Sequence, residues 1–176
     1  DGKANFNIIS GLFTRISQNI SLVNGKTYKL DLQVTTEDVG KQIFVRDTSS
    51  GDLGGLQQLI ILEDGVTDYT YYFTANSNSN AIYIKRQTAS GDYSFSIDNV
   101  SCVEVGQDWT LGTGWSIGED KAVATNAPSD ERLQQNNVFT VGKTYKITYE
   151  ITELTQGFFK VYVGGTFLTS QFSVGV

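Results

Sequence analysis

A stretch of six residues occurs twice in this chain and constrains its fold more than any other feature. Residues 24–29, Asn-Gly-Lys-Thr-Tyr-Lys, return as residues 141–146, Val-Gly-Lys-Thr-Tyr-Lys. In each copy a glycine turn leads into alternating apolar and polar residues, at 28–32 and again at 145–149. Alternation with a period of two is typical of a half-buried strand. The repeat therefore predicts two equivalent β-modules in one chain.

The repeat extends well beyond these six residues. At the same offset of 117, from 142 minus 25, further identities are Arg15/Arg132, Gln18/Gln135, Asn19/Asn136, Thr35/Thr152 and Gly40/Gly157. The second copy has an opening segment, 108–117, without a counterpart in the first, and residues 69–105 have none in the second. We therefore expect residues 1–105 to form a β-sandwich module that lacks its first segment. Residues 106–176 are expected to form the N-terminal half of a second, homologous β-sandwich.

Short runs rich in Thr, Val, Ile, Tyr and Phe predict that the whole chain is all-β. Glycine, asparagine, aspartate and serine separate these runs, and no segment shows helical spacing of apolar residues. Many short antiparallel strands with such turns indicate a sandwich or a barrel. The predicted strands are 4–9, 13–17, 28–35, 42–47, 57–61, 69–75, 81–86 and 93–103.

The composition excludes several classes of function. The chain has 176 residues, no histidine, one cysteine and a formal net charge of −6. Without histidine, a Ser-His-Asp or Cys-His site is impossible. No basic stripe favours nucleic acid or an anionic membrane, and no apolar run matches a bilayer-spanning helix. Cys102 cannot form an internal disulfide and, in an apolar strand position, is expected in the core.

The order of the motifs resembles that of a known group of proteins. Trp109-x-x-Gly112-x-Gly114-Trp115 is followed by Lys121-Ala122, by the Gly-Lys-Thr-Tyr turn and, in the first copy, by the strand Ile97–Ser101. This pattern resembles repeat modules of tail, fibre and head-decoration proteins of tailed bacteriophages. Those modules are similar to the galactose-binding-like jelly roll of carbohydrate-binding modules. The resemblance implies a non-enzymatic structural module in a virion or an extracellular adhesion module.

Aromatic residues are the candidates for glycan stacking. Alternation places Tyr69, Tyr71 and Phe73 on a core face and Tyr72 on the opposite, more exposed face. Tyr83 and Tyr93 are also expected to be exposed, although cross-strand aromatic pairing is the alternative role for all three outward tyrosines. Trp109 and Trp115 are candidates for a sugar platform, but we expect both to pack in the core, as tryptophans in small β-domains commonly do.

Two further kinds of site involve acidic residues, a metal site and a catalytic pair of carboxylates. In the jelly-roll modules that the chain resembles, an acid at the place of Asp98 often helps to hold a structural Ca²⁺, the alternative being an aspartate satisfied by turn amides. No other cofactor is expected, and residues 76–80 are expected to form a loop. Glu150 and Glu153 lie near the central strand of the second copy, where facing acids could sit in a cleft, so a small secreted glycoside hydrolase is the third and least favoured functional hypothesis.

The main hypothesis is a virion structural module, and the alternative is a lectin-like module that contacts glycans. A jelly roll that ends after five or six strands leaves strand edges without partners. We therefore expect strand complementation by other copies of the chain or other virion proteins. Truncation of a longer protein is the alternative explanation.

Overall fold

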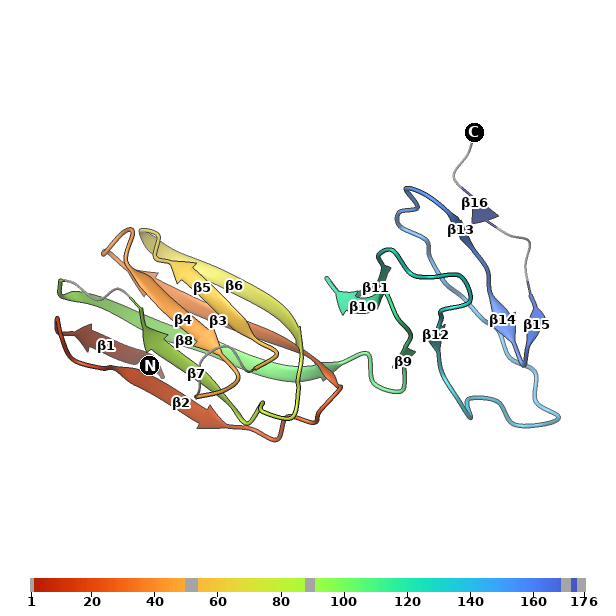
Figure 1. Cartoon of the computed structure of the whole chain (residues 1–176), viewed down its shortest axis with the longest axis horizontal. Helices are drawn as coiled ribbons and strands as arrows, with labels where there is room; N and C mark the ends of the chain where they lie inside the picture. Colours follow the sequence, from red (N-terminus) through yellow and green to blue (C-terminus); the bar gives the residue numbers. More distant parts are fainter. Residues whose placement is uncertain (1, 50–53, 88–90, 169–171, 174–176) are drawn as a thin grey trace. The chain divides into compact units, whose positions relative to one another are not determined.

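The computed structural model describes residues 2–49, 54–87, 91–168 and 172–173 of the chain (Figure 1). It divides into two compact units, residues 1–136 and residues 137–176. No helix among the described residues is long and apolar enough to span a membrane. The two units are considered one at a time.

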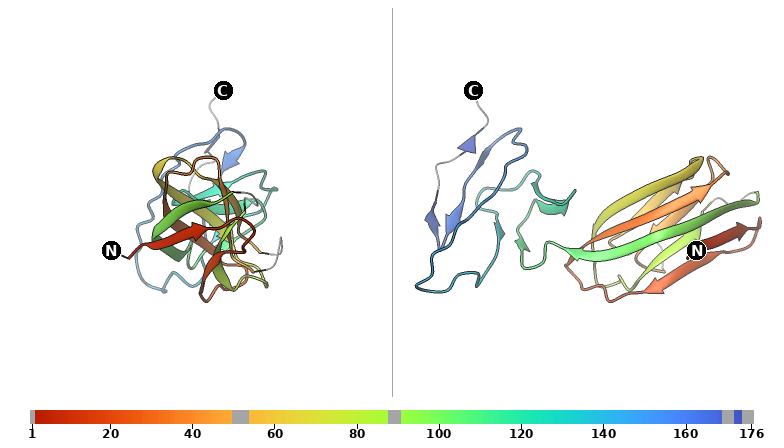
Figure 2. Two further views of the ribbon diagram at one scale, coloured as in Figure 1. Left: turned by 90° about the vertical axis from the view of Figure 1, so that its left-hand side faces the viewer. Right: turned by 180° about the vertical axis from the view of Figure 1, so that it is seen from behind.

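The first unit is built around a sandwich of two four-stranded sheets (Figures 1 and 2). The first sheet has the order β1-β8-β3-β6, and its strands are β1 (Ala4–Ile8), β8 (Tyr93–Val105), β3 (Thr27–Thr36) and β6 (Gly65–Thr74). The second sheet has the order β2-β7-β4-β5, with β2 (Arg15–Asn19), β7 (Ala81–Arg86), β4 (Gln42–Arg46) and β5 (Gln57–Ile61).

Every strand pair within these two sheets is antiparallel. Consecutive strands alternate between the two sheets, except for the β4–β5 hairpin. Such alternation is the connectivity of a jelly roll. The predicted all-β antiparallel sandwich is confirmed, and each of the eight predicted strands of residues 1–105 is present within a few residues of its predicted bounds.

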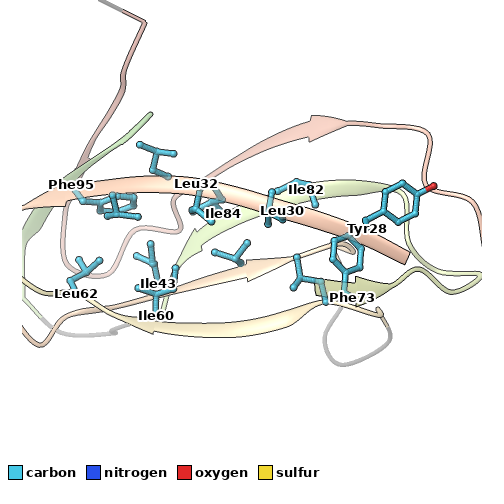
Figure 3. Packing of buried hydrophobic residues seen from close by; sticks show 14 of the residues in the cluster. Tyr28, Leu30, Leu32, Ile43, Ile60, Leu62, Phe73, Ile82, Ile84 and Phe95 are labelled. Atoms are coloured by element: carbon cyan, nitrogen blue, oxygen red, sulfur yellow. The ribbon is translucent and has the colours of Figure 1, made fainter. Parts of the chain in front are cut away.

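The alternation of β3 produces the core. From Tyr28 onward its burial pattern alternates, with Tyr28, Leu30, Leu32 and Val34 buried on one side. These side chains pack against Ile43, Ile60, Ile82 and Ile84 of the second sheet (Figure 3). Burying each such aliphatic side chain contributes about 1.5–3 kcal/mol. The sandwich is therefore held together by this single apolar layer.

The aromatic strand β6 has the predicted orientation. Tyr69, Tyr71 and Phe73 face the core, and the ring centroid of Phe73 lies 5.7 Å from that of Tyr28 on the neighbouring strand. Tyr72 points to the opposite side, where it pairs with Lys29 of β3. The prediction for these four residues is confirmed.

A β-bulge interrupts the pairing of β8 with β3. The register shifts between Asp31 and Gln33, so that three residue steps on β8, from Asp98 to Ser101, oppose two steps on β3. Asn99 takes the left-handed conformation at this point, with φ of 51°, which asparagine tolerates better than most residues. The bulge keeps both halves of the long strand β8 aligned with the core.

The rest of the first unit consists of two short strand pairs. β9 (Thr110–Leu111) pairs with β12 (Leu133–Gln134), and β10 (Trp115–Gly118) pairs with β11 (Lys121–Ala124). The β10–β11 turn has two residues, Glu119 and Asp120, both with positive φ. This is the geometry of a type I′ hairpin turn.

Each strand in the described part of the second unit has two residues. β13 (Phe158–Phe159) pairs with β16 (Phe172–Ser173), and β14 (Tyr162–Val163) pairs with β15 (Thr166–Phe167). Residues 135–157, all described, form no strand, so the strand expected at 145–149 is absent. A strand needs a neighbouring strand for its backbone ladder, and no described strand of the second unit pairs with residues 145–149.

The repeated turn nevertheless has the same geometry in both copies. Gly25 and Gly142 have φ of 82° and 83°. The tyrosine hydroxyl three residues after each glycine accepts a hydrogen bond at 2.9 Å, from the Val23 amide in one copy and the Thr140 amide in the other. The turn is therefore encoded locally, whereas the strand after it depends on partners. The division into two homologous modules stays a prediction.

Candidate functional site

The sequence-predicted aromatic candidates lie on different surfaces of the first unit. Tyr72 lies on the outer side of the first sheet, opposite Lys29, whereas Tyr83 lies on the outer side of the second sheet, opposite Ser17 and Arg46. Both side chains are half-buried. Because the core separates the two sheets, Tyr72 and Tyr83 cannot contact the same sugar.

The third tyrosine candidate is buried, so its predicted exposure is wrong. Tyr93 is only 3% exposed, and its hydroxyl donates a hydrogen bond to the Gln42 carbonyl at 3.0 Å. Burial is the largest cause of the raised pKa of its phenol. The signal was available in the sequence, because Tyr93 alternates in phase with Phe95 and Ile97, which are both core residues.

The outer side of the first sheet carries a row of hydrogen-bonding side chains on β3 and β6. The Gln33 amide donates a hydrogen bond to Asp68 at 2.9 Å, and the Thr70 hydroxyl donates to Asp31 at 2.6 Å. Lys29 and Tyr72 form the next cross-strand pair, with the ammonium nitrogen 5.9 Å from the ring centroid. We call these six residues the polar track. It has a mixture of donors and acceptors held on a flat, rigid sheet.

Asp120, in the β10–β11 turn, lies at the end of the polar track. Its carboxylate accepts a hydrogen bond from the Tyr72 hydroxyl at 3.2 Å, and its amide donates to the same hydroxyl at 3.1 Å. A second contact joins Asp120 to the Lys29 ammonium group at 3.7 Å. Desolvation acts to lower the pKa of Lys29, but the carboxylates of Asp120 and Asp31 raise it overall. Lys29 therefore stays a cation at neutral pH.

Asp120 also lines a hollow with a volume of about 440 Å³. Trp109 is on the wall of this hollow and is 40% exposed. The other polar side chains on the wall are Glu104, Gln107 and Lys121. An aromatic face beside convergent polar groups, in a space of a few hundred Å³, is the usual composition of a small-molecule site.

The expectation that both tryptophans pack in the core is wrong. Trp109 is exposed at the hollow, and Trp115 is half-buried in strand β10. The Trp115 indole nitrogen is buried and has no hydrogen-bond partner among the described residues. The buried residues of the core cluster lie between Ile8 and Ile97, and neither tryptophan packs against that cluster.

The candidate metal and catalytic acids do not converge. Asp98 is half-buried beside the bulge of β8, and its carboxylate accepts a hydrogen bond from the Asn99 amide at 2.8 Å. This is the turn-amide alternative to a calcium ligand, and no group of three His, Cys, Asp or Glu among the described residues is arranged to hold a metal. Glu150 and Glu153 are exposed in the strand-free segment of the second unit.

Cys102 is a core residue, as predicted. It packs against the core cluster from β8, opposite Leu30. Burial raises the pKa of its thiol to about 11, with a smaller contribution from Asp47. A neutral thiol in this position acts as a small apolar side chain.

Asp120 is the site residue that sequence analysis missed. The pair Glu119-Asp120 reads only as a polar turn, and nothing in its spacing points to Tyr72, which is 48 residues away. The contact arises because Asp120, in the two-residue hairpin turn, reaches Lys29 near the start of β3 and Tyr72 near the end of β6. A two-residue turn between alternating segments could have predicted the hairpin, but not where it lies.

Comparison with known proteins gives a likeness in fold alone. No family model matches the chain, and no curated protein matches it either. A solved structure described as "CBM4 structure and function" is 17% identical, with a TM-score of 0.48, over 58% of this chain and 84% of its own. Another, described as "Family 16 Carbohydrate Binding Module-2", is 19% identical, with a TM-score of 0.43, over 57% of this chain and 76% of its own. Neither description mentions a phage protein.

Proposed function

We propose that this chain is a non-catalytic carbohydrate-binding module that binds a glycan along the polar track and in the hollow beside Trp109. The observation that carries the proposal is the position of Asp120. It contacts Tyr72 and Lys29 at the end of the polar track and also lines the hollow. A continuous surface of sheet side chains therefore leads to an exposed indole ring.

The chemistry of this surface suits sugar rings. Sugar hydroxyl groups are both donors and acceptors, and the polar track offers carboxylates, an amide, a hydroxyl and an ammonium group on neighbouring strands. The apolar face of a pyranose ring can lie on the Trp109 indole, which is 40% exposed.

A glycan array with the full chain tests this proposal. Trp109→Ala and Asp120→Ala should each lower the signal at least about tenfold, because they remove the stacking face and the residue that joins the two parts of the site. For neutral glycans, Tyr83→Ala is the matched control, since Tyr83 is a half-buried tyrosine on the opposite sheet. No signal for the unchanged chain, or equal losses for Trp109→Ala and Tyr83→Ala, would contradict the proposal.

A second assay of the same chain tests for catalysis. We expect no release of reducing sugar when the chain is incubated with a bound glycan. The two acids considered for hydrolysis, Glu150 and Glu153, are exposed and belong to the second unit, whereas the residues of the proposed site belong to the first. Turnover that disappears in Glu150→Gln would show that the chain is an enzyme.

A second candidate function is assembly, in a virion or another extracellular structure. It is favoured by a row of exposed apolar side chains at 145–151. Tyr145, Ile147, Tyr149 and Ile151 are 38–45% exposed, whereas their counterparts in the first copy, Tyr28, Leu30, Leu32 and Val34, are at most 6% exposed. In the first copy these side chains are covered by the second sheet, and β3 has a strand partner on each side, β6 and β8.

We infer that another copy of the chain covers this row by strand addition. Light scattering of the purified chain should then show an oligomer, and the amides of residues 144–152 should be protected from hydrogen exchange. A monomer over the micromolar range would contradict the assembly function. The proposed location in a virion rests on the assembly function alone.

A further inference from the structure

The two sheets of the sandwich carry opposite charge. The four strands of the first sheet contain Lys29 as their single cation and four acids, which are Asp31, Asp68, Asp98 and Glu104. The four strands of the second sheet contain no acid and four cations, which are Arg15, Arg46, Lys85 and Arg86. In a chain with a net charge of −6, this concentrates positive charge on one face of the molecule.

The outer side of the second sheet arranges three of these cations in two cross-strand rows, whereas Arg86 lies opposite the core residue Ile43. One row runs Arg15, Lys85, Phe44 and Leu59 across β2, β7, β4 and β5. The adjacent row runs Ser17, Tyr83, Arg46 and Gln57 across the same strands. Arg15 is exposed and Lys85 half-buried, whereas Arg46 is 7% exposed. The charge that a ligand meets is therefore chiefly that of Arg15 and Lys85.

Arg15 and Lys85 lie directly opposite each other on adjacent strands. Like charges at opposed positions destabilise a sheet. An anionic group bound between them would convert that repulsion into attraction. No acid lies on any of the four strands of this sheet.

Aromatic rings on the outer side of the second sheet lie close to the cationic groups. The Arg15 guanidinium carbon is 5.5 Å from the Tyr83 ring centroid, and the Lys85 nitrogen is 5.6 Å from that of Phe44. The Arg46 guanidinium carbon lies closer to Phe44, at 4.2 Å. These contacts hold the side chains flat against the sheet. The rings are then not free to stack with nucleic-acid bases, which is how single strands are commonly bound.

We propose that the outer side of the second sheet binds an anionic polysaccharide, with Arg15 and Lys85 contacting its carboxylate or sulfate groups. Neighbouring strands are about 4.8 Å apart, a spacing of the order of one sugar residue. Leu59, which is 45% exposed at the end of the same row, offers an apolar contact for the ring C–H groups. This site is separate from the glycan site of the first sheet and does not depend on it.

Titration calorimetry of the full chain with defined polymers tests the site. The probes are polygalacturonate, which carries carboxylates, dextran sulfate, which carries sulfates, and a single-stranded DNA oligomer. We expect binding to at least one of the two polysaccharides, weakening as salt rises because exposed charges are screened. Which one binds identifies the anionic group.

Variants then locate the binding. Arg15→Ala and Lys85→Ala should each weaken binding of the polysaccharide about fivefold, and Arg15→Lys should retain most of it. Lys26→Ala, which removes an equal charge from the loop before β3, should leave the affinity unchanged. Circular dichroism of each variant confirms that the sandwich is folded. Failure of both polysaccharides to bind, equal effects of Arg15→Ala and Lys26→Ala, or tighter binding of DNA would overturn the proposal.

Discussion

Asp47 is a buried acid that joins three separate segments at one end of the sandwich. It is fully buried after β4, and its carboxylate accepts hydrogen bonds from the Gly55 amide at 2.8 Å and from the Ser79 hydroxyl. Its carbonyl accepts the Asn80 amide at 2.9 Å. The approach is close enough that a Cβ on Gly54 would lie 1.8 Å from the carboxylate. Asp47 thus fixes the hairpin tip at 76–80, which the sequence predicted only as a loop.

Replacing Asp47 should destabilise the sandwich. Asp47→Ala leaves the Gly55 amide and the Ser79 hydroxyl without their acceptor, which should cost about 2 kcal/mol of unfolding free energy. Urea denaturation followed by tryptophan and tyrosine fluorescence measures this cost. Asp68→Ala is the control, because Asp68 is exposed and should change stability by less than about 0.5 kcal/mol. Equal values for the two variants would contradict the role given to Asp47.

Cys102 should react slowly with alkylating reagents. A pKa of about 11 leaves only about 0.1% of the thiol ionised at pH 8. Because the pKa is raised, the rate of reaction with iodoacetamide should keep increasing from pH 8 to pH 10. The urea-unfolded chain, in which the thiol regains its ordinary pKa, is the reference. Equal rates for folded and unfolded protein at pH 8 would show that Cys102 is not buried.

Individual strands were predictable where the alternation of residues is strict. The strands β3 and β6 follow directly from residues such as Leu30, Leu32 and Phe73, whose spacing of two defines the core face. The segment at 145–149 has the same alternation and forms no strand. Local pattern therefore specifies which face of a strand is apolar, but a strand exists only if neighbours complete its ladder.

Equivalent positions in the two copies of the repeat allow a matched pair of substitutions, which tests whether a strand depends on its neighbours. Leu30→Ala should lower the unfolding free energy by about 3 kcal/mol, because Leu30 is fully buried. Ile147→Ala, at the equivalent position of the second copy, should change it by less than about 0.5 kcal/mol, since Ile147 is 42% exposed. Urea denaturation gives both values. A large cost for Ile147→Ala would show that the second unit has a buried core under those conditions, as the assembly function requires.

At the scale of the whole molecule, the sandwich presents two chemically different faces. The first sheet carries the polar track and four acids, and the second carries the paired cations Arg15 and Lys85. The sequence predicted the sandwich but not this division, because the assignment of strands to sheets decides it. The same is true of the contact between Asp120 and Tyr72, which joins segments that are far apart in the chain.

The central claim is that glycan binds at the polar track and the hollow of the first unit, and nuclear magnetic resonance of the ¹⁵N-labelled chain tests it most directly. On titration with a glycan identified by array, we expect shifts of the Trp109 indole signal and of amides in β3, β6 and the Glu119-Asp120 turn. Amides of β4 and β7 should not move. Shifts confined to β4 and β7, or an unchanged Trp109 signal at saturating glycan, would contradict the account.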